Sequence, residues 1–411
     1  MTRVAIVVQR CHEDIVGGSE TLAWHYAQLL RDSYEVDLLT TTAVDTSVWA
    51  NTLAEGPEIK DEVRIVRFPV TIGRSEYWSG LQTRLHEAFN PPFVPGGNHN
   101  GALPKTRWTI ALQEDFIRHQ GPYSESLFQF IRKNWRDYRA LIFITYLYPT
   151  TYFGLQQLPA GRALFAPTLH DELPAYLPVY KYSARRALEL IWLTAAESQV
   201  GQKLWGDLPG RIVSMAIDSE IREPQRMPVP YLLYSGRVDP NKGCRELFDY
   251  FLTFKKNHPG KLRLIITGID DIPIPEHEDI EFKGFVSAEE KFRLMAGATL
   301  FVIPSPNESF SIVTLEAMAQ KTPVLANSAS TVLADHIKNS GAGSVYGDYQ
   351  SFARALDQLS ENEELLTKMG NLGREYVLSR YGTETVRQAL IAAIESCHEE
   401  AQKYKKVVRA F

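Results

Sequence analysis

The sequence predicts an α/β protein made of two doubly wound, Rossmann-like domains. Short apolar runs bounded by Gly, Pro or Asp alternate with longer amphipathic segments, a pattern typical of parallel strands joined by helices. This pattern starts twice, once in each half, and 411 residues exceed what one hydrophobic core usually supports. We therefore expect two domains that face each other across a central ligand cleft.

The predicted strands follow the apolar runs. In the first half they are residues 4–8, 36–40, 64–68, 140–145, 163–167, 193–196 and 212–216. In the second half they are residues 231–235, 262–267, 280–285, 300–303 and 323–326.

A linker is predicted at 219–230, where three prolines stand among charged residues. The N-terminal domain is then 1–218 and the C-terminal domain 219–385. Apolar residues at helical spacing predict one long helix near the C-terminus, and we expect 386–411 to pack back on the N-terminal domain.

The regular pattern fails within about 72–125, which predicts an insertion rich in aromatic and turn residues. It contains Tyr77, Trp78 and Trp108, and its turn-rich part includes Gly96, Gly97 and His99. Long ordered insertions on a rigid scaffold often carry recognition, and a surface flap without function is the alternative.

Composition excludes several classes of protein. A net charge of -5 argues against a dedicated nucleic-acid binder. The three cysteines are far apart without CxxC spacing, so we expect neither a disulfide framework nor a zinc site, and a reducing cytoplasm fits best. The first residues carry no cleavage signal, and no apolar stretch reaches the ~20 residues of a membrane span. Residues 181–192 predict a core-facing helix, with peripheral contact to an anionic membrane as the alternative.

Two cations follow the predicted strand 231–235. Arg237 and Lys242 stand in the loop Gly236-Arg237-Val238-Asp239-Pro240-Asn241-Lys242-Gly243, at the end of a strand where doubly wound folds bind ligands. Two fixed cations can embrace a diphosphate, the Arg by paired hydrogen bonds and the Lys as a point charge. Ordinary surface cations on a solvated loop are the alternative.

Two carboxylates follow the predicted strand 300–303. Glu308 precedes a helix that begins near Ser311, and Glu316 lies inside that helix. Carboxylates suit sugar and ribose hydroxyls, and free N–H groups at a helix start suit an anion. A helix-capping acid and a solvated helix face are the alternatives, which the apolar neighbours of both residues disfavour. The expected backbone donors are those of Ser309, Phe310, Ser311, Ile312 and Val313.

The first domain offers two weaker signals. Gly17 and Gly18 precede a predicted helix and would let a phosphate or sugar approach the backbone, although a structural turn explains them equally well. His170 follows the predicted strand 163–167, and Asp171 could orient it or cap the next helix. Neither half carries GxGxxG, so a nicotinamide-dependent dehydrogenase is disfavoured.

Together these motifs resemble the retaining glycosyltransferases of family 4, which have the two-domain GT-B fold. The resemblance rests on Gly236-Arg237 with Lys242-Gly243, the two glutamates with seven residues between them, Gly284-Phe285-Val286, and Gly17-Gly18, and it covers almost the whole chain. It implies that Arg237 and Lys242 hold the donor diphosphate and stabilise the leaving group. It also implies that Glu316 binds the ribose hydroxyls.

By the same resemblance, Glu308 and the amides after it contact the transferred sugar, and the backbone around Phe285 and Val286 meets the base. His170 approaches the sugar or the acceptor. The catalytic residues expected from it are His170, Glu308, Arg237 and Lys242.

The implied function is transfer of a hexose with retained configuration, from a nucleoside-diphosphate sugar, with UDP-glucose as first choice. A saccharide or lipid-linked saccharide is the expected acceptor, in polysaccharide or glycoconjugate biosynthesis, and the aromatic residues of 72–125 could stack on its rings. No Asp-x-Asp occurs, so we expect neither a metal nor any other cofactor. A UDP-sugar epimerase and a non-catalytic sugar-nucleotide or glycan-binding relative are the alternatives.

Overall fold

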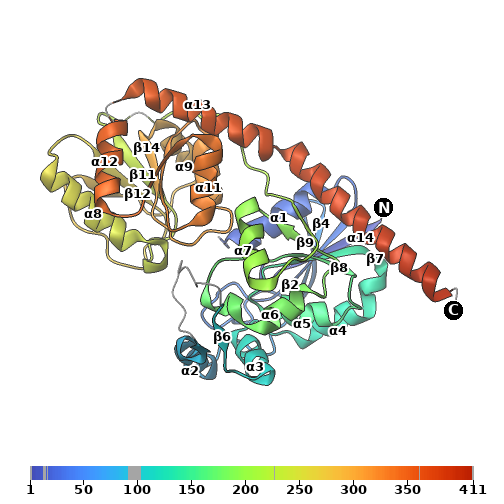
Figure 1. The fold of residues 1–411 in the computed structure, drawn as a ribbon. Coiled ribbons are helices and arrows are strands. Elements are labelled where there is room, and N and C mark those ends of the chain that lie inside the picture. The colour runs from blue at the N-terminus through green and yellow to red at the C-terminus, as the bar shows by residue number, and fades with distance from the viewer. Residues whose placement is uncertain are drawn as a thin grey trace. The chain divides into compact units, whose positions relative to one another are not determined.

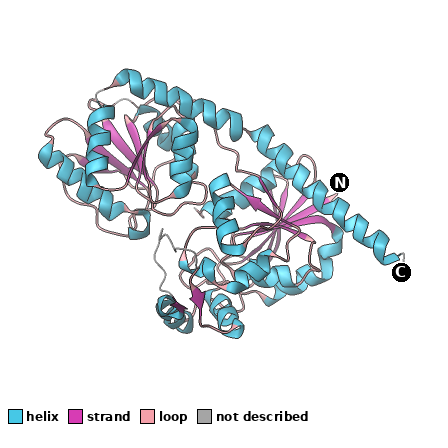
Figure 2. Cartoon of the chain, in the orientation of Figure 1, coloured by secondary structure: helices cyan, strands magenta, loops and turns pink. Residues whose placement is uncertain are grey.

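The chain divides into two compact units. The computed structural model describes residues 2–12, 15, 17–90, 103–225, 227–360 and 362–409 (Figure 1). Unit 1 is Met1–Met215 with Glu384–Phe411, and unit 2 is Ala216–Thr383. Each unit contains a largely parallel sheet with helices around it, as Figure 2 shows, so the predicted α/β fold with doubly wound domains is confirmed.

The sheet of unit 1 has eight strands in the order β10-β9-β8-β7-β1-β2-β4-β3. All neighbours are parallel except β3 and β4. The central strands are buried almost throughout, which explains why they read as continuous apolar runs. The strands are β1 (Arg3–Val7), β2 (Glu35–Thr41), β3 (Gly56–Lys60), β4 (Val63–Phe68), β7 (Tyr138–Ile144), β8 (Ala163–Ala166), β9 (Glu189–Trp192) and β10 (Gly210–Ile212).

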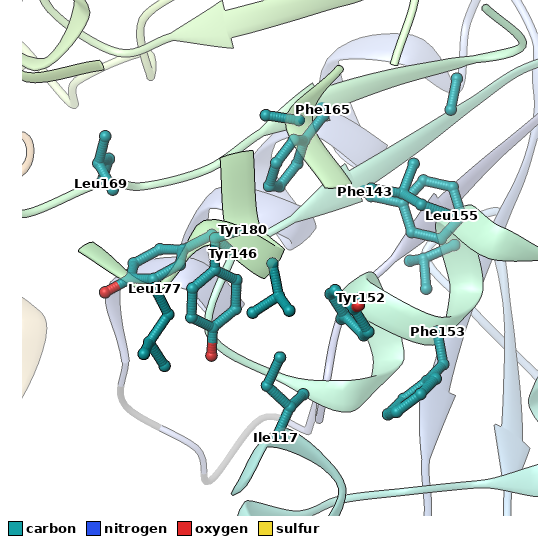
Figure 3. Packing of buried hydrophobic residues seen from close by; sticks show 14 of the residues in the cluster. Ile117, Phe143, Tyr146, Tyr152, Phe153, Leu155, Phe165, Leu169, Leu177 and Tyr180 are labelled. Atoms are coloured by element: carbon teal, nitrogen blue, oxygen red, sulfur yellow. The ribbon is translucent and has the colours of Figure 1, made fainter. Parts of the chain in front are cut away.

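Helices and a buried aromatic cluster complete unit 1. Figure 3 shows this cluster, in which Tyr146 packs edge-on against Tyr180 with ring centroids 4.8 Å apart. The helices are α1 (Gly18–Leu30), α2 (Glu76–Leu85), α3 (Ile110–Gln120), α4 (Glu125–Asn134), α5 (Pro149–Gln156), α6 (Pro178–Ala184), α7 (Ala195–Trp205) and α14 (Thr383–Arg409).

The sheet of unit 2 has six parallel strands in the order β13-β12-β11-β14-β15-β16. They are β11 (Tyr231–Ser235), β12 (Arg263–Thr267), β13 (Ile280–Phe282), β14 (Leu300–Ile303), β15 (Val324–Asn327) and β16 (Gly343–Tyr346). The helices of this unit are α8 (Cys244–Asn257), α9 (Ala288–Gly297), α10 (Ile312–Ala319), α11 (Thr331–Ser340), α12 (Tyr349–Ser360) and α13 (Glu363–Arg380).

Two predicted strands of unit 1 were misplaced. The structure has β9 and β10 in place of strands at 193–196 and 212–216. Each real strand contains a charged residue, Glu189 in β9 and Arg211 in β10, and these two side chains form an ion pair of 2.7 Å. The charged residues interrupt the apolar runs, so apolar runs alone did not predict the bounds of these strands. The helix predicted at 181–192 is also wrong, since α6 ends at Ala184 and β9 follows. The apolar residues of β9 that suggested a membrane surface belong to the core.

The insertion forms regular structure in its described part. It contains α2, α3 and the short antiparallel pair β5 (Phe89–Asn90) and β6 (Lys105–Thr106). Trp78 and Trp108 both pack on Phe116, with ring centroids 5.9 Å apart in each case, whereas Tyr77 is 49% exposed. Gly96, Gly97 and His99 lie outside the described residues.

The long helix α14 belongs to unit 1, although it follows unit 2 in the chain. The Glu395 carboxylate accepts hydrogen bonds from the Tyr34 hydroxyl at 2.7 Å and from Arg139 Nε at 2.8 Å. No helix in the described part of the chain is both long enough and apolar enough to cross a membrane.

Candidate nucleotide-sugar site

The sheet of unit 2 reverses its winding direction between β11 and β14. These strands are hydrogen-bonded neighbours, with Leu232 opposite Leu300, although they are distant in sequence. Strands β12 and β13 extend the sheet on one side, and β15 and β16 on the other. In open α/β sheets the connections diverge to opposite faces at such a point, and ligands bind there at the carboxyl ends of the strands.

The loop after β11 holds Lys242 in a fixed backbone geometry. The Asp239 carboxylate caps the short helix Pro240–Lys242 by accepting hydrogen bonds from Asn241 N and Lys242 N. Gly243 then has a φ of 72°, and a Cβ at this position would lie 2.3 Å from the Pro304 carbonyl oxygen. Only glycine therefore fits where this loop meets the end of β14.

Lys242 and Glu308 meet at the switch point. Lys242 Nζ donates to Glu308 Oε1 at 2.8 Å, and this pair joins the loop after β11 to the loop after β14. Arg237 has a side chain that is 57% exposed, and its Nε lies 3.8 Å from Asp239 Oδ2. The structure thus brings together a cation and a carboxylate that are far apart in sequence and leaves the Arg237 guanidinium largely in solvent.

Helix α10 begins at a strained residue. Ser311 is its N-cap and has φ 60° and ψ 69°, the left-handed region that glycine favours. The Ser311 hydroxyl shares a hydrogen bond of 2.8 Å with the Thr314 hydroxyl. By helix geometry the first N–H groups of α10, including those of Ile312 and Val313, have no acceptor within the helix. This end of α10 can therefore bind an anion.

Glu316 lies on α10 and is almost buried, with 9% of the residue exposed. Its Oε2 accepts a hydrogen bond from Lys291 Nζ, in α9, at 2.7 Å. Glu308 and Glu316 therefore each have a lysine partner, so neither is a simple solvated acid.

The loop around Phe285 adjoins the loop after β12. Gly268 N donates to the Gly284 carbonyl at 2.9 Å, and a Cβ on Gly268 would lie 1.9 Å from the Gly236 carbonyl oxygen. Phe285 is 68% exposed, and Val286 is partly buried. The loops that follow β11, β12 and β13 thus lie backbone against backbone, and an exposed aromatic ring stands at the end of the row.

In unit 1 the winding direction reverses between β1 and β7. Gly17 is the N-cap of α1, the first helix after β1, and Gly18 is the first residue of that helix. A Cβ on Gly17 would lie 2.2 Å from Glu20 Oε2, whereas a Cβ on Gly18 would meet nothing within 4 Å. A side chain at Gly17 would therefore displace the Glu20 carboxylate, whereas Gly18 has open space beside it among the described residues.

His170 stands in the loop after β8. Thr168, two residues earlier, has a left-handed φ of 49°. His170 Nδ1 is buried and finds no hydrogen-bond partner among the described residues. Neither interpretation of Asp171 holds, because its carboxylate accepts from Tyr176 at 2.6 Å and from Lys203 at 2.9 Å instead. The next short helix is capped by Glu172 without a side-chain hydrogen bond.

Comparison with known proteins identifies the second half of the chain. Residues 218–376 match the family described as Glycosyl transferases group 1. The chain carries a glycosyltransferase group 1 domain. This domain lies within unit 2 and contains the Lys242–Glu308 pair, Glu316 and Arg237.

Relatives extend this likeness without covering the whole chain. The chain is 24% identical over 180 residues to the capsular polysaccharide biosynthesis glycosyltransferase CapM of Staphylococcus aureus, which covers 41% of this chain and 47% of CapM. It is 35% identical over 114 residues to the D-inositol 3-phosphate glycosyltransferase of Nocardioides sp., which covers 27% of this chain and 24% of that protein. The chain spans less than half the length of the curated relatives it matches.

Solved structures resemble the whole chain. Sucrose-phosphate synthase from Thermosynechococcus elongatus superimposes with a TM-score of 0.65 at 16% identity, over 100% of both chains. HepE from Anabaena, solved in complex with UDP and glucose, does so with a TM-score of 0.63 at 13% identity, over 96% of this chain and 100% of that one. At these identities the likeness concerns the fold alone, which is GT-B.

Sequence reasoning missed His336 in the group 1 domain. This buried side chain lies in α11, and its Nε2 is 2.9 Å from the Phe310 carbonyl oxygen. Because a carbonyl only accepts, Nε2 carries the proton, and Nδ1 accepts from the Tyr376 hydroxyl at 3.0 Å. Burial lowers the pKa of His336 and keeps the ring neutral. No signal near residue 336 points to the loop at 308–311, so only the structure could reveal this anchor.

Two further residues were missed. Lys291 could have been predicted from the sequence, because a buried Glu316 requires a cation nearby. Lys291 lies in α9, the helix before β14 and α10. Glu197 in α7 accepts backbone hydrogen bonds from Leu169 N at 2.7 Å and Leu193 N at 2.6 Å. Burial raises the pKa of Glu197 to about 8, against the opposing effect of these bonds. Glu197 thus holds the loop that carries His170.

Proposed function

We propose that the chain is a retaining glycosyltransferase of the family 4 type, which transfers a hexose from a nucleoside-diphosphate sugar. The observation that carries the proposal is the Lys242–Glu308 pair, which places a cation and a carboxylate together at the switch point of the group 1 domain. The lysine cation suits a diphosphate, and the carboxylate can accept hydrogen bonds from sugar hydroxyls.

The donor is assigned as UDP-glucose. In this assignment Lys242 and the exposed Arg237 bind the diphosphate, the free N–H groups at the start of α10 add to them, and Glu316 binds the ribose. The exposed Phe285 and the neighbouring Val286 lie beside the base. Two structural relatives support the choice, since HepE was solved with UDP and glucose and an Escherichia coli relative with UDP-2-fluoro glucose.

The reaction proceeds on one face of the sugar. The bond between the anomeric carbon and the β-phosphate oxygen breaks, the acceptor hydroxyl oxygen bonds to the same face, and its proton passes to the leaving phosphate. Lys242 and Arg237 stabilise the charge that develops on that phosphate, which is the task a metal ion performs elsewhere. Because the chain has no Asp-x-Asp and offers these two cations, the proposed reaction requires no metal.

Unit 1 is assigned to the acceptor. Among the described residues, His170 Nδ1 has no hydrogen-bond partner and Gly18 has open space beside it. His170 also stands where a doubly wound fold places chemistry. The proposed acceptor is a saccharide or lipid-linked saccharide in polysaccharide or glycoconjugate synthesis. The capsular polysaccharide role in the name of CapM supports this class.

Calorimetric titration of UDP, GDP and ADP in the presence of EDTA tests the donor site. We expect UDP to bind tightest, and Lys242→Ala and Glu316→Ala to lose this binding. Arg263→Met is the matched control, because it removes an ion pair of 3.2 Å with Glu281 in the same unit at the opposite end of a strand. Absence of binding by all three nucleotides would refute the proposal.

Two product measurements test the reaction. NMR of the product of UDP-glucose transfer should show the anomeric configuration of the donor, and an inverted centre would refute the retaining mechanism. Turnover that disappears with EDTA and returns with a divalent ion would refute metal independence. Donor binding without turnover on any acceptor in an array would favour a non-catalytic relative.

A further inference from the structure

A rigid loop in unit 1 presents Trp49 to the carboxyl end of the sheet. One Asp45 oxygen accepts hydrogen bonds from Val48 N at 2.7 Å and Trp49 N at 3.0 Å, and the other accepts from Ala50 N at 2.9 Å. Burial alone would raise the pKa of Asp45, but these hydrogen bonds hold it well below its usual range. Trp49 is 1% exposed, with a left-handed φ of 61°, and its indole N–H donates to the Gln120 carbonyl at 2.8 Å.

Two glycines let neighbouring segments close around this tryptophan. A Cβ on Gly73 would lie 2.2 Å from the Val48 carbonyl oxygen, and a Cβ on Gly121 would lie 2.6 Å from Trp49 Cδ1. Arg74 follows Gly73, and its backbone N–H donates to the same Val48 carbonyl at 3.3 Å. The backbone of Arg74 is therefore fixed by the surrounding structure.

The Arg74 guanidinium has aromatic neighbours, and the Asp45 carboxylate acts on it only from beyond ion-pair distance. Its Cζ lies 4.4 Å from the ring centroid of Trp78 and 5.9 Å from that of Trp49, and its Nε donates to the Gln120 carbonyl at 3.4 Å. No carboxylate among the described residues lies within ion-pair distance of it. Burial lowers the pKa of Arg74, and the group nevertheless stays charged. Within the described part of the chain, this half-buried cation with five donors thus uses one of them in a single long hydrogen bond.

Arg10 shows how the same surroundings treat a compensated arginine. Its Cζ lies 6.0 Å from the Trp49 ring, and its Nε pairs with the buried Glu20 at 2.6 Å. Arg10 and Arg74 therefore both lie beside one tryptophan, and among the described residues only Arg10 forms an ion pair.

Arg74 lies near the carboxyl ends of the strands of unit 1, the unit that is assigned to the acceptor. Tyr148, which caps α5 after β7, packs edge-on against Trp49 with ring centroids 5.3 Å apart. Burial raises the pKa of Tyr148 to about 12, and the nearby charges of Glu20 and Arg74 act on it in opposite directions. The guanidinium thus lies near the residues that follow β1 and β7, the switch point of unit 1.

We propose that the acceptor carries an anionic group, a phosphate or a carboxylate, which binds the Arg74 guanidinium and supplies the missing partner. This inference rests on the proposed function only in taking the ligand of unit 1 to be the acceptor. A guanidinium stacked on Trp78 presents its N–H edge in one plane, which matches the paired oxygens of either anion. Because the planar ring system and the backbone already fix this edge, little side-chain freedom is lost on binding.

Tryptophan fluorescence tests the proposal, since Arg74 contacts two tryptophans. The probes are D-glucose, D-glucose 6-phosphate, D-glucuronate and geranyl phosphate, which separate a neutral sugar, a sugar phosphate, a sugar carboxylate and a lipid phosphate. At least one anion should bind about tenfold tighter than glucose, as expected of a charge-assisted pair. The tightest anion identifies the source of the charge.

Three variants decide whether Arg74 is responsible. Arg74→Met should remove the preference for the anion, and Arg74→Lys should keep part of it at low salt. Arg118→Met is the matched control, because Arg118 also contacts an aromatic ring, Phe153, at 5.2 Å but pairs with Asp115. Equal binding of all probes, or a preference that survives in Arg74→Met, would overturn the inference. UDP binding is measured on the same samples. If the wild-type protein does not bind UDP, the proposed donor site is refuted, independently of the result for Arg74.

Discussion

Replacing Glu308 by Gln removes the negative charge from the Lys242–Glu308 ion pair and keeps the volume of the side chain. In the free protein Glu308 holds Lys242 at 2.8 Å, with side chains that are 13% and 36% exposed, so solvent screens the pair in part. Such a pair contributes about 0.2–1 kcal/mol. Without the carboxylate, Lys242 is free for the diphosphate, and UDP should bind between about 1.4-fold and 5-fold tighter. Transfer of glucose should nevertheless fall at least tenfold, because the sugar hydroxyls lose the carboxylate that accepts their hydrogen bonds.

Lys242→Met should have the opposite effect on UDP. It removes a charged hydrogen-bond donor worth about 1.5–3 kcal/mol, so UDP should bind roughly 10- to 150-fold more weakly. Calorimetry with UDP and a coupled assay with UDP-glucose measure both variants, with Arg263→Met as the control that should change neither. If Glu308→Gln weakened UDP binding as much as Lys242→Met does, Glu308 would not face the sugar, and the assigned geometry would be wrong.

Three other predictions concern stability. Burial raises the pKa of Glu197 from its ordinary 4.5 to about 8, so the folded state keeps a proton that the unfolded chain releases in that window. The Tm of the wild type relative to Glu197→Gln should therefore fall as the pH rises from 5 to 8, and a constant difference would refute this. Ser311→Gly should be more stable than Ser311→Ala by about 1 kcal/mol in urea unfolding, since both lose the hydroxyl and only Gly relieves the left-handed backbone. Glu395→Gln should lower the Tm of unit 1 and speed proteolysis of α14, and unchanged cleavage would show that its bonds to Tyr34 and Arg139 contribute nothing.

The central strands and the loops of the group 1 domain were predictable from sequence. Strands β11 and β14 were predicted with the bounds that the structure has, because both faces of a central parallel strand are buried and its residues are mostly apolar. Once two such strands are located, the residues after them are candidates for a common site. Lys242 and Glu308 were both predicted as site residues by this logic, but the direct ion pair between them was not predicted.

The remainder depends on contacts that sequence spacing does not encode. The edge strand β10 pairs with β9, and the Glu189–Arg211 ion pair joins these two strands. Each of the two strands contains a charged residue that interrupts the apolar pattern. His336 reaches Phe310 from another helix, and Glu197 reaches Leu169 across two loops. In the sequence, His336 and Glu197 look like ordinary helix residues, because their partners are distant along the chain and are brought close only by the fold.

The chain passes from unit 1 to unit 2 and back, since Glu384–Phe411 returns to the unit in which the chain begins. As a result, unit 2 is encoded by one uninterrupted stretch, whereas unit 1 is encoded in two pieces. A premature stop codon after residue 383 would leave the group 1 domain whole and remove the helix whose Glu395 binds Tyr34 and Arg139. A lesion downstream of the segment that encodes unit 2 would thus damage unit 1, most of which is encoded upstream of that segment.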